Sequence, residues 1–452
     1  MAPIRHVVVL VLENRSFDQM LGGLQPSCPG LDGIDPAAPP RENYLTSGPP
    51  FQQLPMQYTI TFPDPRHELE HVRYQIAGDN AYFVLDYAIN YPDTTPEQRR
   101  QIMGYYPAGF LEATHTLASN FTVCDQWFAS VPGPTWTNRL FVLSGTSLGR
   151  VRMPESVFHP NLHWYDQDTI FDRLDKAGVS WRVYAGDFPL SLLFVHQLQP
   201  ENLARYRGLE RFTADTQGPE ADFPAFVFIE PHYIGDQASD DHPPHDVING
   251  ELLIASTYNA IRANDALWKS TLLVTLFDEH GGFYDHVCPP ADAIPPDEHD
   301  DEFDFKQFGV RVPALLVSPW VERAVVKTRF DHTSLLKYVI DKWSLGMLGN
   351  RTAAANTFAA CIRTSGDART DTPGSLQVTT SPGTPVSARV LTENEQAIVL
   401  LSQQLDTRSL TSPSPVVTRV ARAMANSPTV RDDVRDQLRR FLARYAESRP
   451  EF

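Results

Sequence analysis

The chain has 452 residues, of which 42% are hydrophobic and 21% charged, so it has the composition of a globular protein and not of a disordered one. Its length allows one large domain with insertions, or two or three ordinary domains. The 38 basic and 55 acidic residues give a net charge of −17, which argues against nucleic acid as a substrate or partner. This charge does not exclude an anionic substrate, because a bound cation can reverse the local field.

The cysteines indicate neither a disulfide framework nor a zinc or redox site, because the chain has only four of them and no pair has CxxC spacing. No apolar stretch approaches the ~20 residues of a membrane span. The N-terminal apolar run is shorter than the roughly 7–15 residues of a signal-peptide core. The numbered sequence therefore predicts a cytoplasmic protein, or a secreted or periplasmic one whose export signal has been removed. The oligomeric state is left open.

Apolar runs alternate with helical patterns along the chain, which predicts an α/β fold with a mostly parallel central sheet sandwiched between helices. The predicted strands cover residues 7–12, 121–128, 179–184, 223–231, 272–277 and 312–319. The predicted helices cover residues 68–82, 110–120, 169–178 and 250–264, with further helices that begin near 138 and 330.

Long irregular insertions, at residues 25–66 and 291–304, interrupt these elements, and loops of that length are usually functional. We expect a catalytic domain over 1–363, a loop or linker over 364–390 and a helical C-terminal tail over 391–452 that packs on the core. The tail opens with a capping box, Thr392 and Glu395. We interpret it as a packing element and not as part of the chemistry.

Three of the predicted strands end in oxygen-bearing side chains, namely Glu13-Asn14, Glu230 and Asp278-Glu279. The carboxyl ends of parallel strands meet at one edge of a sheet, where α/β proteins bind their ligands. Acidic groups gathered there repel one another unless a cation lies between them. The pattern predicts one divalent metal ion, with Mg, Ca or Mn favoured by oxygen ligands and Zn left open by nearby histidines. The alternative is that Asn14 merely caps the following helix.

Thr135 follows a rigid Pro-Gly-Pro turn and stands where a helix is predicted to begin. Unpaired backbone N–H groups at such a junction suit an anion or a nucleophile. A hydroxyl bound to a metal ion has a depressed pKa and can attack near neutral pH. The alternative is that Thr135 or Thr137 is an ordinary helix cap.

Four motifs in a fixed order resemble the bacterial phosphoesterase family of phosphatidylcholine-type phospholipases C and acid phosphatases, within the alkaline phosphatase superfamily. The resemblance covers roughly residues 4–345, and the motifs are Glu13-Asn-Arg-Ser-Phe-Asp18, Gly133-Pro-Thr-Trp-Thr-Asn-Arg139 with Ser144-Gly-Thr146, Asp241-His-Pro-Pro244 and Asp278-Glu-His-Gly-Gly-Phe-Tyr-Asp-His286.

The resemblance implies an alkaline-phosphatase-like fold and one metal ion held by Glu13, Asn14, Asp278 and Glu279. The family nucleophile, which also binds the metal, corresponds to Thr135.

The histidines of the family that face the phosphate correspond best to His67 and His242, and His280 is a further candidate. Asn138 and Arg139 are expected to bind the phosphate or to brace the loop. The same resemblance assigns a structural role in holding turns to Arg15, Ser16, Asp18, Asp285 and His286.

The predicted function is that of a metal-dependent phosphoric ester hydrolase. Thr135 attacks phosphorus to form a phosphothreonine, and His242 or a neighbouring histidine protonates the leaving alkoxide. Because the tail is short and looks helical, we expect an acid-phosphatase-like phosphomonoesterase that acts on a small phosphate ester. The alternative is a phospholipase C that acts on phosphatidylcholine-type lipid head groups.

Two other functions are less favoured by the sequence. A sulfatase would need a modified cysteine or serine in a CxPxR-type motif, and no cysteine here has that context. A non-catalytic binding protein would have lost a ligand or the nucleophile, whereas every proposed position holds a competent residue.

Overall fold

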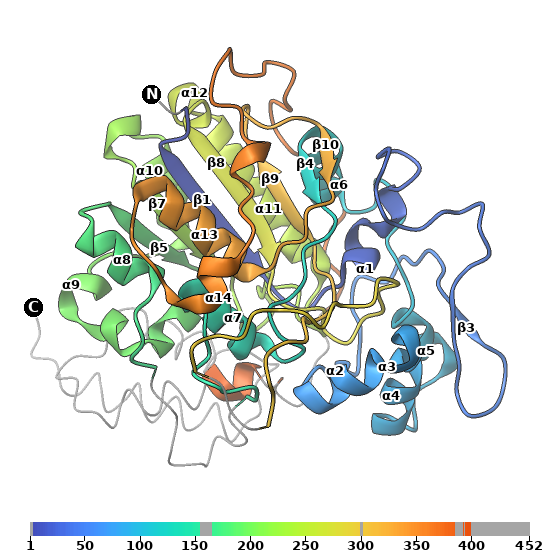
Figure 1. The fold of residues 1–452 in the computed structure, drawn as a ribbon. Coiled ribbons are helices and arrows are strands. Elements are labelled where there is room, and N and C mark those ends of the chain that lie inside the picture. The colour runs from blue at the N-terminus through green and yellow to red at the C-terminus, as the bar shows by residue number, and fades with distance from the viewer. Residues whose placement is uncertain (1–2, 154–164, 299–301, 385–391, 393, 399–452) are drawn as a thin grey trace, which may run out of the picture.

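The computed structural model describes residues 3–153, 165–298, 302–384, 392 and 394–398. In this part of the chain a mostly parallel sheet has the strand order β10-β4-β9-β8-β1-β7-β5-β6, and only β9 runs antiparallel to its neighbours (Figure 1). Its strands are β1 (His6–Leu12), β4 (Thr122–Cys124), β5 (Trp181–Ala185), β6 (Tyr206–Gly208), β7 (Phe226–Glu230), β8 (Thr271–Phe277), β9 (Ala314–Val317) and β10 (Ala324–Val326). The predicted fold class is confirmed.

The central strand β1 pairs with β7 on one side and with β8 on the other. Both of its faces are buried, which is why its sequence is continuously apolar and does not alternate. Leu12 lies opposite Phe277 of β8, so the two strands end at the same level. The residues that follow each strand are therefore neighbours.

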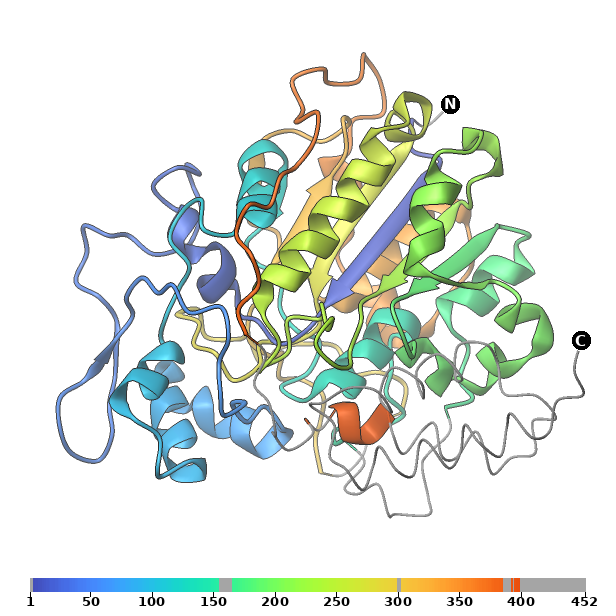
Figure 2. The same ribbon diagram turned by 180° about the vertical axis from the view of Figure 1, so that it is seen from behind.

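Helices cover both faces of the sheet. Helices α7, α8 and α13 lie on one face (Figure 1), and α6, α10 and α11 lie on the other (Figure 2). The helices of the described residues are α1 (Phe17–Leu21), α2 (Leu69–Gln75), α3 (Ala77–Asn80), α4 (Phe83–Asn90), α5 (Pro96–Gln101), α6 (Glu112–Asn120), α7 (Thr135–Ser144), α8 (Ile170–Lys176), α9 (Pro200–Leu203), α10 (Leu209–Thr216), α11 (Val247–Arg262), α12 (Asp265–Trp268), α13 (His332–Trp343) and α14 (Gly349–Ala354).

The insertion between β1 and β4 forms its own lobe beside the sheet (Figure 1). It contains the two-stranded hairpin of β2 (Glu42–Asn43) and β3 (Phe51–Gln52), and a small separate hydrophobic cluster. The single helix predicted over 68–82 is in fact two, α2 and α3. Gly78 and Asp79 adopt positive φ angles of 60° and 62°, which end the regular helix.

Three further expectations can be compared with the structure. The aromatic strand predicted over 121–128 is shorter, because only Thr122–Cys124 pairs with β9 and β10. All four cysteines are free, in agreement with the sequence. None of the helices in the described ranges is both long and apolar enough to cross a membrane.

The domain boundaries expected at 363 and 390 stay predictions. Of the predicted tail, only residues 392 and 394–398 lie within the described residues. The capping box is present, since Glu395 N donates to Thr392 Oγ1 at 3.1 Å and Thr392 N donates to Glu395 Oε2 at 2.9 Å.

A buried arginine joins the segments that support the end of β1. Arg311 Nε donates to Asp285 Oδ1 at 3.0 Å and Arg311 Nη2 donates to Asp18 Oδ1 at 3.1 Å. Its guanidinium also lies 4.4 Å from the ring centroid of Phe17. Burial lowers the pKa of the neighbouring His286, but its hydrogen bonds with Asp18 and Asp32 outweigh burial and raise that pKa to about 9. Asp285 and His286 therefore have the structural role expected of them.

Replacing this arginine should destabilise the fold strongly. Arg311→Met leaves the buried Asp285 carboxylate without its ion-pair partner and leaves Asp18 with His286 alone, and breaking a buried pair in this way costs about 3–5 kcal/mol. We expect a clear fall in the melting temperature, measured by differential scanning calorimetry. The matched control is Arg329→Met, since Arg329 makes a two-pronged pair with Asp292 at the surface, where such pairs contribute about 0–1 kcal/mol. Equal melting temperatures for the two variants would contradict the prediction.

Candidate active site

The ends of β1 and β8 bring together the acidic and amide residues that the sequence singled out. Asn14 N donates to Asp278 Oδ1 at 3.4 Å, and Arg15 N donates to Glu279 O at 3.0 Å. Glu13, Asn14, Asp278 and Glu279 are all fully buried. The turn after β8 needs Gly281, because its φ is +63° and a Cβ atom there would lie 2.3 Å from Asn14 O.

Asn14 is not the cap of the following helix. Ser16 is the N-cap of α1 and accepts a hydrogen bond from Gln19 N. Asn14 has a positive φ of 58° and directs its side chain into the cluster. Because His67 Nδ1 donates to Pro65 O at 2.8 Å, His67 Nε2 is an acceptor and takes a hydrogen bond from Asn14 Nδ2 at 3.2 Å. The Asn14 carbonyl oxygen therefore faces Thr135.

Thr135 is the first residue of α7 and is not its cap. The N-cap position belongs to Pro134, and the helix begins three residues earlier than the sequence predicts. Thr135 Oγ1 donates to Asn14 Oδ1 at 3.4 Å, across 121 residues of sequence. The Thr135 hydroxyl therefore contacts the cluster of residues at the strand ends, as expected if it and the cluster bind the same metal ion.

Negative charge outweighs positive charge around these residues. Arg139 donates to Asp278 Oδ2 through Nε at 2.8 Å and lies 3.4 Å from Glu13 Oε1 through Nη2. Burial raises the pKa of Asp278 to about 7 in spite of Arg139, and burial together with repulsion from Asp278 raises the pKa of Glu13 well above its ordinary value. Glu279 Oε1 is buried without a hydrogen-bond partner. The cluster therefore contains more negative charge than its one arginine offsets.

The three predicted histidines differ in what their ring nitrogens contact. His280 shares a 2.9 Å hydrogen bond with Gln75 Oε1 through Nε2, and its Nδ1 lies 3.5 Å from Glu279 Oε2. His242 Nδ1 donates to Pro243 O at 2.6 Å, whereas His242 Nε2 is buried and has no hydrogen-bond partner. The rings of His242 and His67 lie 5.5 Å apart, edge to face. Of these three histidines, His242 therefore has a ring nitrogen, Nε2, that makes no hydrogen bond, and this atom lies 3.8 Å from Asp64 Oδ2.

Asn138 and Arg139 were expected either to bind phosphate or to brace the loop, and both make bracing contacts within the protein. Asn138 Nδ2 donates to the carbonyls of Val131 and Gly133, at 3.3 and 2.9 Å, and Asn138 Oδ1 accepts from Val131 N. Arg139 also donates to the carbonyl of Leu12 through Nη2 at 3.3 Å. These contacts support bracing by Asn138 and a tie between α7 and the strand ends by Arg139.

One of the three acidic strand ends does not join the cluster. Glu230 Oε2 accepts from Leu190 N at 2.7 Å and from Tyr233 Oη at 2.9 Å, and Glu230 Oε1 accepts from Ser191 Oγ at 2.7 Å. These donors take up the carboxylate of Glu230. Its grouping with Glu13 and Asp278 was wrong, because the strand end alone does not set the direction of the side chain.

Two residues at the site were not assigned to it from the sequence. His332 Nε2 donates to Asp278 O at 2.6 Å from the first turn of α13. Asn394, from the C-terminal tail, donates to both carboxylate oxygens of Glu13 at 3.1 and 3.0 Å. The tail, which the sequence predicts to be a packing element, therefore also contacts a residue of the candidate site. Of these two residues, only His332 had a local signal in the sequence, because it follows Asp331, the residue that caps a helix.

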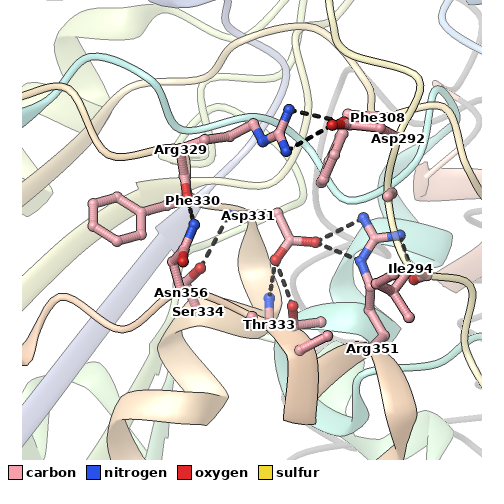
Figure 3. A pocket seen from close by; sticks show the side chains of 13 residues that line it. Asp292, Ile294, Phe308, Arg329, Phe330, Asp331, Thr333, Ser334, Arg351 and Asn356 are labelled. Atoms are coloured by element: carbon pink, nitrogen blue, oxygen red, sulfur yellow. Dashed lines mark hydrogen bonds and ion pairs between the residues drawn. The ribbon is translucent and has the colours of Figure 1, made fainter.

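A small polar cavity of about 90 Å³ lies at the start of α13 (Figure 3). Asp331 accepts from Arg351 Nη2 at 2.8 Å and from Thr333 N at 3.1 Å, and Arg351 also donates to Ser130 O at 2.9 Å. The charged groups of this cavity are paired with one another. These contacts therefore hold the start of α13, where His332 lies, and the charged groups of the cavity are not free to bind a ligand.

Comparisons with known proteins place this chain in a family. The model described as "Phosphoesterase family" matches residues 4–346. Non-specific phospholipase C6 of Arabidopsis thaliana is 33% identical over 411 residues, which cover 83% of this chain and 75% of the relative. Phospholipase C B of Mycobacterium tuberculosis is 28% identical over 428 residues, which cover 79% of this chain and 78% of the relative.

Among solved structures, an alkaline phosphatase superfamily protein from Vibrio parahaemolyticus matches with 12% identity and a TM-score of 0.32, over 73% of this chain and 74% of that one. This likeness is loose, and the family assignment depends on the sequence matches. The chain belongs to the Phosphoesterase family and is a hydrolase that acts on phosphoric esters.

Proposed function

We propose that Thr135 is the nucleophile of this hydrolase and is transiently phosphorylated. The observation that carries this proposal is the hydrogen bond from Thr135 Oγ1 to the Asn14 amide, at the point where the ends of β1 and β8 meet. Attack by the hydroxyl on phosphorus forms an O–P bond, breaks the bond to the leaving alkoxide and yields phosphothreonine. Water then attacks phosphorus and releases Thr135.

One divalent metal ion fits the buried residues of the site. Glu13, Asn14, Thr135, Asp278 and Glu279 would hold it. The unpartnered Glu279 Oε1 and the raised pKa values of Glu13 and Asp278 are what a missing positive charge produces. Oxygen donors favour Mg, Ca or Mn, and Zn stays open. When bound, such an ion lowers the pKa of the attacking hydroxyl and offsets charge on the phosphoryl oxygens.

The histidines divide the remaining work according to their contacts. His242 Nε2, which makes no hydrogen bond and lies 3.8 Å from Asp64 Oδ2, can carry a proton to the leaving oxygen. His67 orients the Asn14 amide, and His280 lies beside Glu279. Burial, with the neighbouring His67 and His245, lowers the pKa of His242 well below its ordinary value, so its acid form increases as the pH falls. We therefore expect activity to favour mildly acidic pH.

The substrate we favour is a phosphodiester of the phospholipid type. The observation in its favour is that several relatives at 31–33% identity are named non-specific phospholipases C. A phosphomonoester, which is the first expectation from the sequence, is the second candidate. Both share the attack by Thr135 and differ only in the second group carried by phosphorus.

Removing the hydroxyl should abolish turnover of either substrate. For Thr135→Ala we expect a loss of at least about 10³-fold in kcat, because the nucleophile is gone. Hydrolysis of p-nitrophenyl phosphorylcholine and of p-nitrophenyl phosphate is measured side by side, with Thr135→Ser as the control that keeps the attacking oxygen. Intact mass spectrometry of rapidly quenched wild-type enzyme should show one added phosphorylcholine group with the diester and one added phosphoryl group with the monoester. Full activity of Thr135→Ala would refute the covalent route, and faster hydrolysis of the monoester would favour the second candidate.

Removing the proposed proton donor should lower kcat most for substrates with poor leaving groups. For His242→Gln we expect a loss of about 10²–10⁴-fold with an alkyl ester of phosphorylcholine, and less than about tenfold with the p-nitrophenyl ester, whose leaving group needs no proton. The measurement is kcat for both esters. His71→Gln is the control, since His71 pairs with Asp86 outside the site. An equal loss with both esters would assign the proton transfer to another group.

Metal binding should stabilise the fold more at high pH than at low pH. A carboxyl whose folded pKa is raised destabilises the fold progressively as the pH rises from its unfolded pKa to its folded pKa, by about 1.4 kcal/mol per pH unit for each proton retained. Asp278, with its pKa raised to about 7, is such a group, and a bound cation removes this cost.

The gap in melting temperature between metal-loaded and chelator-treated protein should therefore widen from pH 5 to pH 8. Buried acids away from the proposed ligands contribute to both samples and cancel in the difference, whereas Glu13, whose pKa is also raised, adds to the change in the gap. Asp278→Asn is the control, and in this variant the gap in melting temperature should increase less between pH 5 and pH 8. A gap that does not change with pH would contradict the assignment of the metal to these carboxylates.

A further inference from the structure

The C-terminal tail reaches the centre of the site through a single buried amide. Asn394 Nδ2 lies 3.1 Å from Glu13 Oε1 and 3.0 Å from Glu13 Oε2, across 381 residues of sequence. Asn394 Oδ1 accepts a hydrogen bond from Trp136 Nε1 at 3.0 Å. Asn394 is only 2% exposed. This one side chain therefore contacts a proposed metal ligand and the residue that directly follows the proposed nucleophile.

The orientation of the Asn394 amide follows from its partners. The indole N–H of Trp136 can only donate, and the carboxylate of Glu13, when ionised, can only accept. The carbonyl oxygen of Asn394 must therefore face Trp136, and its NH₂ group must face Glu13. A flipped amide would place a donor against a donor and an acceptor against an acceptor.

The segment around Asn394 is held firmly in place. Residues 394–398 form one helical turn beside α7 at the carboxyl edge of the sheet (Figure 2), and the Thr392–Glu395 capping box starts that turn. Ala397 and Ile398 are buried in the main hydrophobic cluster. On the other side, His245 Nε2 lies 3.7 Å from Glu395 Oε1. The amide is thus presented by a packed and capped turn.

We propose that Asn394 is a positioning residue of the active site, which holds the Glu13 carboxylate and the first turn of α7 in the arrangement that metal binding and phosphoryl transfer require. The proposal rests on the function proposed above, in which Glu13 is a metal ligand. Arg139 contacts Glu13 Oε1 alone, at 3.4 Å. Asn394 contacts both oxygens and so sets the plane of the carboxylate, as outer hydrogen bonds do for ligands in metal sites.

The test compares Asn394→Leu with Asn259→Leu. Asn259 ties another C-terminal segment to the body, since it accepts from Leu376 N at 2.7 Å and donates to Leu376 O at 2.9 Å, and it makes none of these contacts with Glu13. Each protein is stripped of metal and titrated calorimetrically with Mg²⁺, Ca²⁺, Mn²⁺ and Zn²⁺ in turn. Melting temperatures and kcat and KM are measured on the same samples.

For Asn394→Leu we expect metal affinity to fall about 10–100-fold, as is typical when an outer partner of a ligand is lost, and kcat to fall with little change in KM. For Asn259→Leu we expect a comparable fall in melting temperature with metal affinity unchanged. Trp136→Phe keeps an aromatic ring but frees the Asn394 amide from its anchor. It should show a smaller loss of metal affinity in the same direction, and it decides the question if Asn394→Leu does not fold.

Wild-type metal affinity in both Asn394→Leu and Trp136→Phe would overturn the proposal. So would a rise in kcat for Asn394→Leu, because that would mean that the amide obstructs the site. The variant Glu13→Gln distinguishes a failure of the proposed metal ligands from a failure of the role proposed for Asn394. If Glu13→Gln binds metal like the wild type, the proposed ligand set fails. If Glu13→Gln loses metal while Asn394→Leu does not, only the role of Asn394 fails.

Discussion

The concentration of buried negative charge at the ends of β1 and β8 is the constraint on which the rest of the site depends. Glu13, Asp278 and Glu279 are fully buried and neighbouring, because two parallel strands end at the same level. Carboxylates do not stay ionised in such a place without cations. Arg139 supplies one positive charge from α7, and the proposed divalent ion supplies the remainder.

Much of the surrounding structure holds these carboxylates and the hydroxyl in place. His332 Nε2 binds the Asp278 carbonyl from the start of α13, and the Arg351–Asp331 ion pair fastens that helix end. On the other side His67, from the long insertion, orients the Asn14 amide. The site is therefore built from many separate segments, and two of its residues, Thr135 and His332, come from the first turn of a helix.

The acidic motifs have two different uses within the same chain. At Asp18 and Asp285 the negative charge is matched by Arg311 inside the protein, so that cluster is complete and structural. At Glu13, Asp278 and Glu279 the protein supplies fewer cationic groups than carboxylates among the described residues. The two clusters therefore differ in their internal cations and not in their acidic residues, and this difference supports the proposal of a metal ion at the second cluster.

The sequence alone determined the α/β class, the strands that matter and most of the candidate residues. This was possible because a continuous apolar run followed at once by polar groups is a local pattern with one main structural meaning, the buried strand with a functional end. The fold decided which of those groups meet. Glu230 is turned toward residues 190–191, and Asn394 reaches Glu13 from the far end of the chain. It also decided that Thr135 is the first residue of its helix and not the cap, and that His242 Nε2 makes no hydrogen bond and lies 3.8 Å from Asp64 Oδ2. Side-chain direction and partners hundreds of residues away depend on packing, which has no short-range signature in the sequence.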